Sequence, residues 1–350
     1  MPKKILSDSN NFLILAALLS DVFYVSADSE TVVDPESGLT FSVNFSGRTV
    51  TSVDFYGGEL PDDGVLRIPD IIQYNGQNVE VTGISKEMNA NNPSYKESLK
   101  ELWIPESVKS ISSGLFAGYE ELSDVNLEGV DSIGTNAFGN CAKLRNVSLP
   151  EGLTSIPDSC FMNCVSLTQI TFPESLDVIG NMSFKDAGLN SVTIPGDVSL
   201  VDFAAFQGCP LTSVTIEGSD ASPKDMQLGH YAFFTNTDTL RKVLCYRPVP
   251  PVMTGTGTSF SPATFRNAYL QLLGDAESHL AEYEADPYWS LFMSEDKPIY
   301  TSVDGLMDDL YGGEYYVYDM NGVLRMKTMD SSLPYLPKGM YIVNGHKVII

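Results

Sequence analysis

Apolar residues recur along this chain at a fixed interval. Six successive units each begin with Leu-x-x-apolar-x-apolar, continue with a second apolar pair and end in Phe. The opening residues are Leu99, Leu122, Leu144, Leu167, Leu189 and Leu211, spaced 22 or 23 apart. The aromatic positions are Phe116, Phe138, Phe161, Phe184, Phe206 and Phe233. A repeat of this length predicts stacked coils that bury their apolar residues against one another.

The first part of each unit has the alternation of a β-strand. In "LTQITF" (167–172), the first, fourth and sixth residues are predicted to point inward, while Gln169 and Thr171 point outward. Proline lacks an N–H, so residues such as Pro150 and Pro173 end the strand and turn the chain. The pattern predicts parallel strands joined by short irregular or helical returns.

Both ends of such a stack need covering, because the terminal coils expose apolar edges. "LTFSVNFSGRTVTSVDFYG" (39–57) reads as a hairpin that turns at Ser46-Gly47 and caps the first coil. "DAESHLAEYEADPYWSLF" (275–292) has helical periodicity and offers Trp289 and Phe292 to the last coil.

The last part of the chain has a different pattern. "EYYVYDMNGVLRMKT" (314–328) and "GMYIVNGHKVII" (339–350) each place Asn-Gly between alternating apolar residues, a strong hairpin signal. The predicted fold class is therefore a β-rich repeat solenoid of parallel strands, followed by a small antiparallel β module.

The N-terminus has the pattern of a secretory signal. Lys3 and Lys4 precede a short apolar stretch, "FLILAALL" (12–19), and "VSA" (25–27) ends in a small residue suited to cleavage. We predict a signal peptide over residues 1–27. No other stretch is long and apolar enough to span a bilayer, so we expect no membrane insertion after cleavage.

Three segments resemble the BspA-like leucine-rich repeats of surface and secreted proteins from oral and gut anaerobes. They are "LRNVSLPEGLTSIPDSCFMNC" (144–164), "LTQITFPESLDVIGNMSF" (167–184) and "LRIPDIIQYNGQNVEVTGI" (66–84), and the resemblance covers roughly residues 38–295. It implies a leucine-rich-repeat solenoid that acts in adhesion or ligand binding, with no shared catalytic residues and no single shared ligand.

The end of the chain, "VYDMNGVLRMKT…LPKGMYIVNGHKVII", resembles the C-terminal sorting domain of proteins exported by the type IX route. This resemblance implies recognition by the secretion machinery; a small β module without that role is the alternative. The predicted domains are a signal peptide (1–27), an N-terminal capping hairpin (28–64), a leucine-rich-repeat solenoid with its C-terminal cap (65–298) and a sorting-like domain (299–350).

The charge excludes some partners. The formal net charge is -24 and the isoelectric point is about 4.3. Such a surface repels nucleic acid and anionic lipid, so we expect neither as a partner.

The five cysteines fit the repeat better than they fit a metal or redox site. Cys141, Cys164 and Cys209 occupy one repeat position, and Cys160 stands where the preceding unit has Ala137. We interpret them as small buried fillers, since Cys160 and Cys164 lack Cys-x-x-Cys spacing. Cys245 leaves an odd number, and the disulfide state stays open.

Candidate catalytic chemistry is sparse. His230, His279 and His346 fall in three different modules, and the chain contains no nucleophile elbow, zinc-protease or phosphate-loop motif. We therefore predict a protein that is not an enzyme, with no catalytic, cofactor-binding or metal-binding residues.

The outward strand positions are the candidate ligand-binding face. The residues are Glu101, Trp103, Asp124, Asn126, Asn146, Gln169 and Thr171. One interpretation is a ladder of small polar residues suited to a crowded parallel sheet. The other is a binding face, with Trp103 as a stacking surface unless the N-terminal cap or the 85–98 insertion covers it.

These patterns predict a secreted or outer-surface repeat protein that binds a macromolecule through the solenoid face. The first candidate ligand is a host or environmental protein, as in adhesion. The alternative is a glycan-binding accessory protein of a nutrient-capture system. Secretion machinery is a further expected partner of the C-terminal domain.

Overall fold

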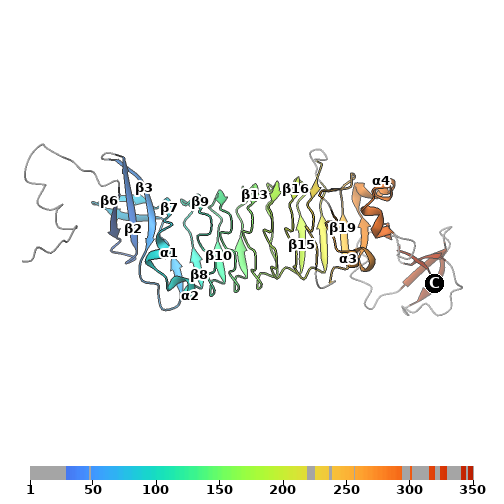
Figure 1. The fold of residues 1–350 in the computed structure, drawn as a ribbon, viewed down its shortest axis with the longest axis horizontal. Coiled ribbons are helices and arrows are strands. Elements are labelled where there is room, and N and C mark those ends of the chain that lie inside the picture. The colour runs from blue at the N-terminus through green and yellow to red at the C-terminus, as the bar shows by residue number, and fades with distance from the viewer. Residues whose placement is uncertain are drawn as a thin grey trace, which may run out of the picture.

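The computed structural model describes residues 29–46, 49–218, 225–235, 239–255 and 257–293, with the strands 300–301, 315–319, 324–328, 340–343 and 346–349. The predicted signal peptide lies outside these residues. The described chain forms an elongated solenoid with an antiparallel sheet at its N-terminal end and short helices at the other (Figure 1). This confirms the predicted fold class.

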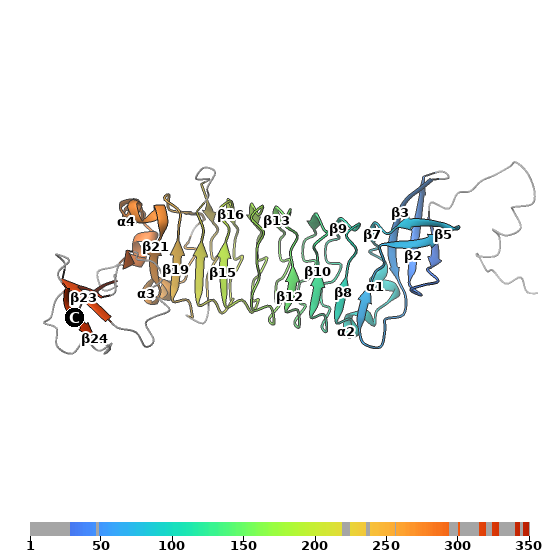
Figure 2. The same cartoon turned by 180° about the vertical axis from the view of Figure 1, so that it is seen from behind.

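One side of the solenoid, the front sheet, is built from the strands that follow the repeat leucines (Figure 2). These strands are β4 Val65–Arg67, β8 Glu101–Trp103, β10 Asp124–Asn126, β12 Asn146–Ser148, β15 Ser191–Ile194, β17 Ser213–Ile216, β19 Lys242–Cys245 and β21 Tyr269–Leu272. Except between β12 and β15, neighbours pair in parallel and in register, so Leu66, Leu102 and Val125 stack inward.

The second side, the rear sheet, takes a two-residue strand from each coil. Its strands are β9 Ser110–Ile111, β11 Ser132–Ile133, β13 Ser155–Ile156, β14 Val178–Ile179, β16 Leu200–Val201, β18 Gln227–Leu228 and β20 Val252–Met253. β9 pairs with β11, and the other five form a separate parallel sheet. The second residue of each strand is buried.

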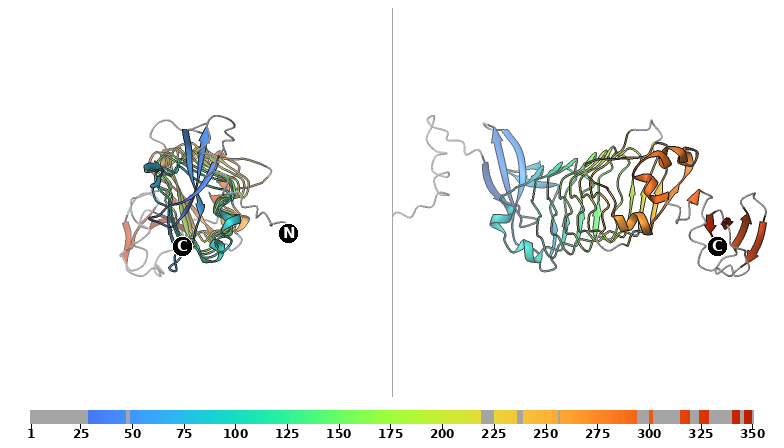
Figure 3. Two further views of the ribbon diagram at one scale, coloured as in Figure 1. Left: turned by 90° about the vertical axis from the view of Figure 1, so that its left-hand side faces the viewer. Right: turned by 45° about the vertical axis from the view of Figure 1, so that its right-hand side comes forward.

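The third side, the turn ladder, carries the repeat phenylalanines. The N–H of Phe138 donates to the carbonyl of Cys160 in the next coil at 3.0 Å, and the same bond recurs along the stack. Residues two before and two after each Phe are left-handed in most coils: Asn136 and Asn140 have φ of 56° and 62°. Asn and Gly tolerate this conformation better than other residues. Viewed along the long axis, the coils superimpose (Figure 3, left).

Phenylalanine rings form a column through the core. Phe116, Phe138, Phe161, Phe184, Phe206, Phe233 and Phe260 are all fully buried. Successive ring centroids are 5.3–5.6 Å apart and the rings are within 17° of parallel. The column thus confirms the predicted repeat register and runs one ring further than the sequence pattern indicated.

The cysteines are buried, as the repeat suggested, and all five are free thiols. The thiols of Cys141, Cys164 and Cys209 donate to a Phe carbonyl of the preceding coil at 3.1, 3.3 and 3.0 Å. Burial raises the pKa of Cys141 and of Cys209 to about 12, which keeps these thiols protonated. Their role is to fill space and satisfy a carbonyl group.

The N-terminal end is covered by a small sheet. β1 (Ser29–Val33), β2 (Thr40–Ser46) and β3 (Thr49–Gly57) are antiparallel, and β7 (Gly83–Ile84) joins β3 in parallel. The bounds of the other elements here are β5 Ile71–Tyr74, β6 Gln77–Glu80, α1 Met88–Asn91 and α2 Tyr95–Ser98. β5 and β6 form a hairpin whose turn residues, Asn75 and Gly76, both have positive φ.

The C-terminal end is covered by α3 (Pro262–Asn267), α4 (Leu280–Ala285) and the 3₁₀ helices η2 (Gly274–His279) and η3 (Trp289–Met293). Trp289 and Phe292 are buried edge-on against Phe260, which closes the ring column. Beyond them, β22 (Tyr300–Thr301) pairs with β21. The module that follows is an antiparallel sheet of β23 Tyr315–Asp319, β24 Leu324–Thr328, β25 Met340–Val343 and β26 His346–Ile349.

One coil departs from the predicted pattern. Residues 168–172 form no strand, so the front sheet is divided between β12 and β15. Gln169 and Thr171 are exposed and Phe172 is buried, as expected, but Ile170 is only half-buried. Phe172 stands where neighbouring coils have Ile or Leu. Its larger ring contacts Phe184 of its own coil and Phe206 of the next.

Candidate ligand-binding face

The register of the front sheet aligns the outward side chains in two rows. Val65, Glu101, Asp124 and Asn146 lie opposite one another in the first row. Arg67, Trp103, Asn126 and Ser148 make up the second. Parallel strands are about 4.8 Å apart, so neighbours within a row are close enough to share a ligand.

Trp103 is exposed to solvent on this face. Its side chain is 46% exposed, the guanidinium carbon of Arg67 is 5.5 Å from its ring centroid, and its Nε1 donates to Glu101 at 3.4 Å. Neither the N-terminal cap nor the 85–98 insertion buries it, so that alternative is wrong. Sequence analysis did not single out Arg67, although "LRIP" and "LWIP" share an ending that aligns Arg67 with Trp103.

Asp124 and Asn146 form a polar pair next to Glu101. The Nδ2 of Asn146 donates to one carboxylate oxygen of Asp124, and the hydroxyl of Ser123 donates to the other. Asp124 is therefore held in one orientation while remaining partly exposed. We call Arg67, Glu101, Trp103, Asp124 and Asn146 the Trp103 cluster.

Asn126 has a different role. Its Oδ1 accepts from the backbone N–H of Ile104 at 2.8 Å, and its Nδ2 donates to the Ile104 carbonyl at 3.2 Å. Both polar groups of the amide are thus engaged by the neighbouring strand, where Ile104 is buried. We assign Asn126 a structural role at the end of β8 and leave it out of the Trp103 cluster.

The face continues beyond the cluster without charge. Gln169 and Thr171 lie in the coil without a strand, so the structure does not bring them into the hydrogen-bonded rows. Polar, uncharged residues occupy the outward positions from β12 to β17; together we call them the neutral array. Its members are Ser148, Gln169, Thr171, Ser191, Thr193, Ser213 and Thr215.

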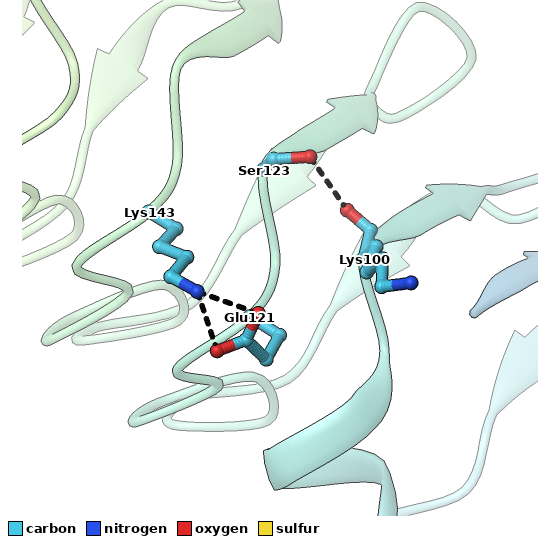
Figure 4. A network of polar contacts seen from close by, with 4 residues as sticks. All are labelled: Lys100, Glu121, Ser123 and Lys143. Atoms are coloured by element: carbon cyan, nitrogen blue, oxygen red, sulfur yellow. Dashed lines mark hydrogen bonds and ion pairs between the residues drawn. The ribbon is translucent and has the colours of Figure 1, made fainter. Parts of the chain in front are cut away.

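Charges on the flank of the cluster are balanced. Lys143 Nζ contacts both carboxylate oxygens of Glu121 at 2.6 and 2.7 Å, and the Ser123 hydroxyl, whose one proton is shared between two acceptors, is also 3.1 Å from the carbonyl oxygen of Lys100 (Figure 4). Lys100 and Arg145 are exposed directly before Glu101 and Asn146 in the chain. Several of the few cationic residues of this acidic chain thus belong to the coils that carry the Trp103 cluster.

The corner on the other side of the front sheet is acidic. Glu106, Glu128, Glu151 and Glu174 are exposed, one per coil, just after the strand segments. Burial and the nearby Glu174 raise the pKa of Glu217. This acidic corner opposes the approach of an anionic ligand.

Other candidate chemistry is dispersed. In the part of the chain that the structure describes, no group of three or more His, Cys, Asp or Glu side chains is placed to hold a metal ion. His230 stacks on Tyr231 at 3.6 Å, whereas His279 contacts Glu282 in the C-terminal cap. Among the same residues, no helix has the length and hydropathy needed to cross a membrane.

Coils of this length, stacked in parallel around a column of aliphatic and aromatic residues, define a leucine-rich-repeat solenoid. Residues 87–213 match the family model described as "BspA type Leucine rich repeat region", in six copies. This region of the chain is thus similar to leucine-rich repeats of the BspA type. No curated protein matches the chain in a sequence search.

Solved structures with similar folds include three bacterial leucine-rich repeat proteins. A leucine-rich repeat protein of Bacteroides ovatus is 21% identical over 69% of this chain and 79% of its own, with a TM-score of 0.31. A leucine-rich repeat protein of T. pallidum is 23% identical to this chain, covers 64% of this chain and 85% of its own, and has a TM-score of 0.38. A leucine rich cell surface protein of Faecalibacterium prausnitzii is 16% identical to this chain, covers 72% of this chain and 88% of its own, and has a TM-score of 0.35.

Proposed function

We propose that this chain is an exported, non-enzymatic repeat protein that binds a macromolecular ligand at the Trp103 cluster. The observation that carries the proposal is the exposed indole of Trp103 on a rigid sheet. A large, rigid aromatic side chain exposed at an outward strand position is the kind of residue that anchors ligands and partners. Adhesion to a surface molecule and capture of a nutrient polymer are the two roles that such a site supports.

Substitution of Trp103 by Ala tests this site. We expect binding to weaken at least tenfold, because exposed Trp anchors are often worth 2 kcal/mol or more. Stability should change by less than about 1 kcal/mol, since no core residue is removed. Affinity would be measured against matrix proteins and a glycan array, and stability by denaturant unfolding of the same sample. Full affinity combined with a large loss of stability would contradict the proposal.

Export rests on the signal-like pattern of residues 1–27 and on the resemblance to surface proteins. The tail resembles a type IX sorting domain, and recognition of β23–β26 by secretion machinery is part of this proposal. A chain that ends after Thr301 keeps β22 on the edge of β21. We expect this truncated chain to fold but to accumulate in the periplasm of the native host. Normal display, seen by protease shaving of whole cells, would contradict the sorting role.

A further inference from the structure

The Trp103 cluster joins one aromatic plane to carboxylate, amide and guanidinium groups on four neighbouring strands. We propose that it binds a sugar ring of an uncharged glycan, an inference that rests on the function proposed above and specifies its ligand. The indole stacks against the C–H face of the ring, and the carboxylates of Glu101 and Asp124 accept hydrogen bonds from its hydroxyls. Few, well-placed polar groups beside an aromatic surface are typical of small-ligand recognition.

The groups that would contact the sugar are held before it arrives. Asp124 already accepts hydrogen bonds from Ser123 and Asn146, and Glu101 accepts one from Trp103. Arg67 lies against the indole ring from β4. Side chains fixed in this way lose little conformational entropy when a ligand binds, which favours affinity at a small site.

The surroundings of Trp103 fit a sugar better than a protein surface. A protein interface has an apolar core made of several large side chains. The other large hydrophobic residues exposed in the described chain are Val33, Ile71, Val165, Tyr246, Val249, Val252 and Leu291. None of them belongs to the two outward rows of the front sheet. Trp103 is therefore an isolated aromatic surface among polar groups, which suits one sugar ring.

Charge favours an uncharged ligand. Within the Trp103 cluster, Arg67 offsets one of the two carboxylates, and the exposed carboxylates that would attract a basic peptide are those of the acidic corner, which is outside the cluster. The net charge of the whole chain is -24, which repels sulfated or carboxylated polymers.

The neutral array offers further hydrogen-bonding groups to the glycan on one side of Trp103. Arg67 is on the β4 side of Trp103, while β10 and β12 lie on the other side and lead to the array. Side chains such as Ser148, Thr171 and Thr193 have no hydrogen-bond partner among the described residues. Further sugar units can therefore hydrogen-bond along the face, and longer oligosaccharides should bind more tightly than short ones.

Titration calorimetry of the full chain tests the inference. The probes are uncharged gluco-, manno-, xylo- and chito-oligosaccharides of increasing length, with polygalacturonate and heparin as anionic probes and poly-lysine as a cationic one. We expect one uncharged series to bind, with affinity that rises with length and is insensitive to salt. Trp103→Ala and Asp124→Ala should each weaken it at least tenfold. Tyr246→Ala, which removes an aromatic residue exposed elsewhere, is the matched control and should bind normally.

The outcomes separate this inference from the proposed function. Lack of binding to every uncharged series overturns the glycan assignment, and so does salt-sensitive binding to a charged probe alone. If a matrix protein then binds in a Trp103-dependent way, the proposed function stands with a protein ligand. Glycan binding that persists in both cluster variants overturns the assignment of the site.

Discussion

The interior column of phenylalanines and the outer face of the front sheet differ in regularity. The column runs from Phe116 to Phe260 with nearly constant spacing. In contrast, the front sheet is divided at residues 168–172, and its outward residues change from Trp and carboxylates to hydroxyls along its length. The same repeat thus produces one uniform side and one variable side.

The difference shows which side holds the coils together. Across the coil without a strand, the turn ladder continues: Phe161 N–H donates to the Ser183 carbonyl at 2.7 Å and Phe184 N–H to the Ala205 carbonyl at 2.8 Å. Because this ladder and the ring column are continuous, strand pairing on the front side can stop for one coil. The outward residues of the front sheet are then free to specialise for binding.

Replacing Phe161 by Ala should have the largest effect. The ring is fully buried between Phe138 and Phe184, so its loss should lower the free energy of unfolding by about 3–5 kcal/mol. Denaturant unfolding measures this change. Val165→Ala in the same coil is the control, because that side chain is 58% exposed and its loss should be almost neutral. Equal stabilities for the two variants would disprove the importance of the column.

Asn126→Ala should have a smaller but clear effect. It leaves the backbone N–H and carbonyl of Ile104 without their side-chain partner, which typically costs about 1–3 kcal/mol. Ser148→Ala, in the same row, should be almost neutral, because that side chain is exposed and has no hydrogen bond to the described residues. The denaturant midpoints of the two variants are compared. If the stability of Asn126→Ala is unchanged, Asn126 has no structural role and belongs with the outward residues that are available for ligand binding.

The buried thiols should make the protein less stable in alkali. Their pKa is raised from 9.0 to about 12 in Cys141 and Cys209, so the folded state keeps both protons where the unfolded chain loses them. The stabilising contribution is complete below about pH 9 and declines up to about pH 12, by about 1.4 kcal/mol per pH unit for each thiol.

The double variant Cys141→Ala, Cys209→Ala isolates this contribution from other groups that titrate in alkali. Its unfolding free energy, measured from about pH 9 to about pH 10, should fall less steeply than that of the unaltered chain. Identical slopes would mean that these thiols ionise in the folded state.

The interior could be predicted from the sequence because each of its features depends on the period alone. The Phe positions and the cysteine positions both follow from the spacing of the repeat. Phe260 follows Phe233 by 27 residues, the same interval that separates Phe206 from Phe233, so extending the pattern by one more coil would have predicted it.

The face was harder to predict, because it depends on pairing between distant segments. Arg67 and Trp103 are neighbours because β4 pairs with β8 across a hairpin and two short helices, and this intervening segment hides a register that only the shared ending of "LRIP" and "LWIP" indicates. The role of Asn126 follows from a side-chain rotamer that sequence does not specify. The interrupted strand at 168–172 has the same alternation as its neighbours, so the pattern alone predicted it as regular.

A column of parallel rings has no inherent end, and any uncovered coil is a template on which another chain can be added. In this protein, Trp289 and Phe292 meet Phe260 edge-on, at 68° and 84°, instead of offering a parallel face. The next ring therefore has nothing to stack on. This change of angle removes the parallel ring face on which a further coil could stack, and so works against end-to-end addition at the C-terminal end.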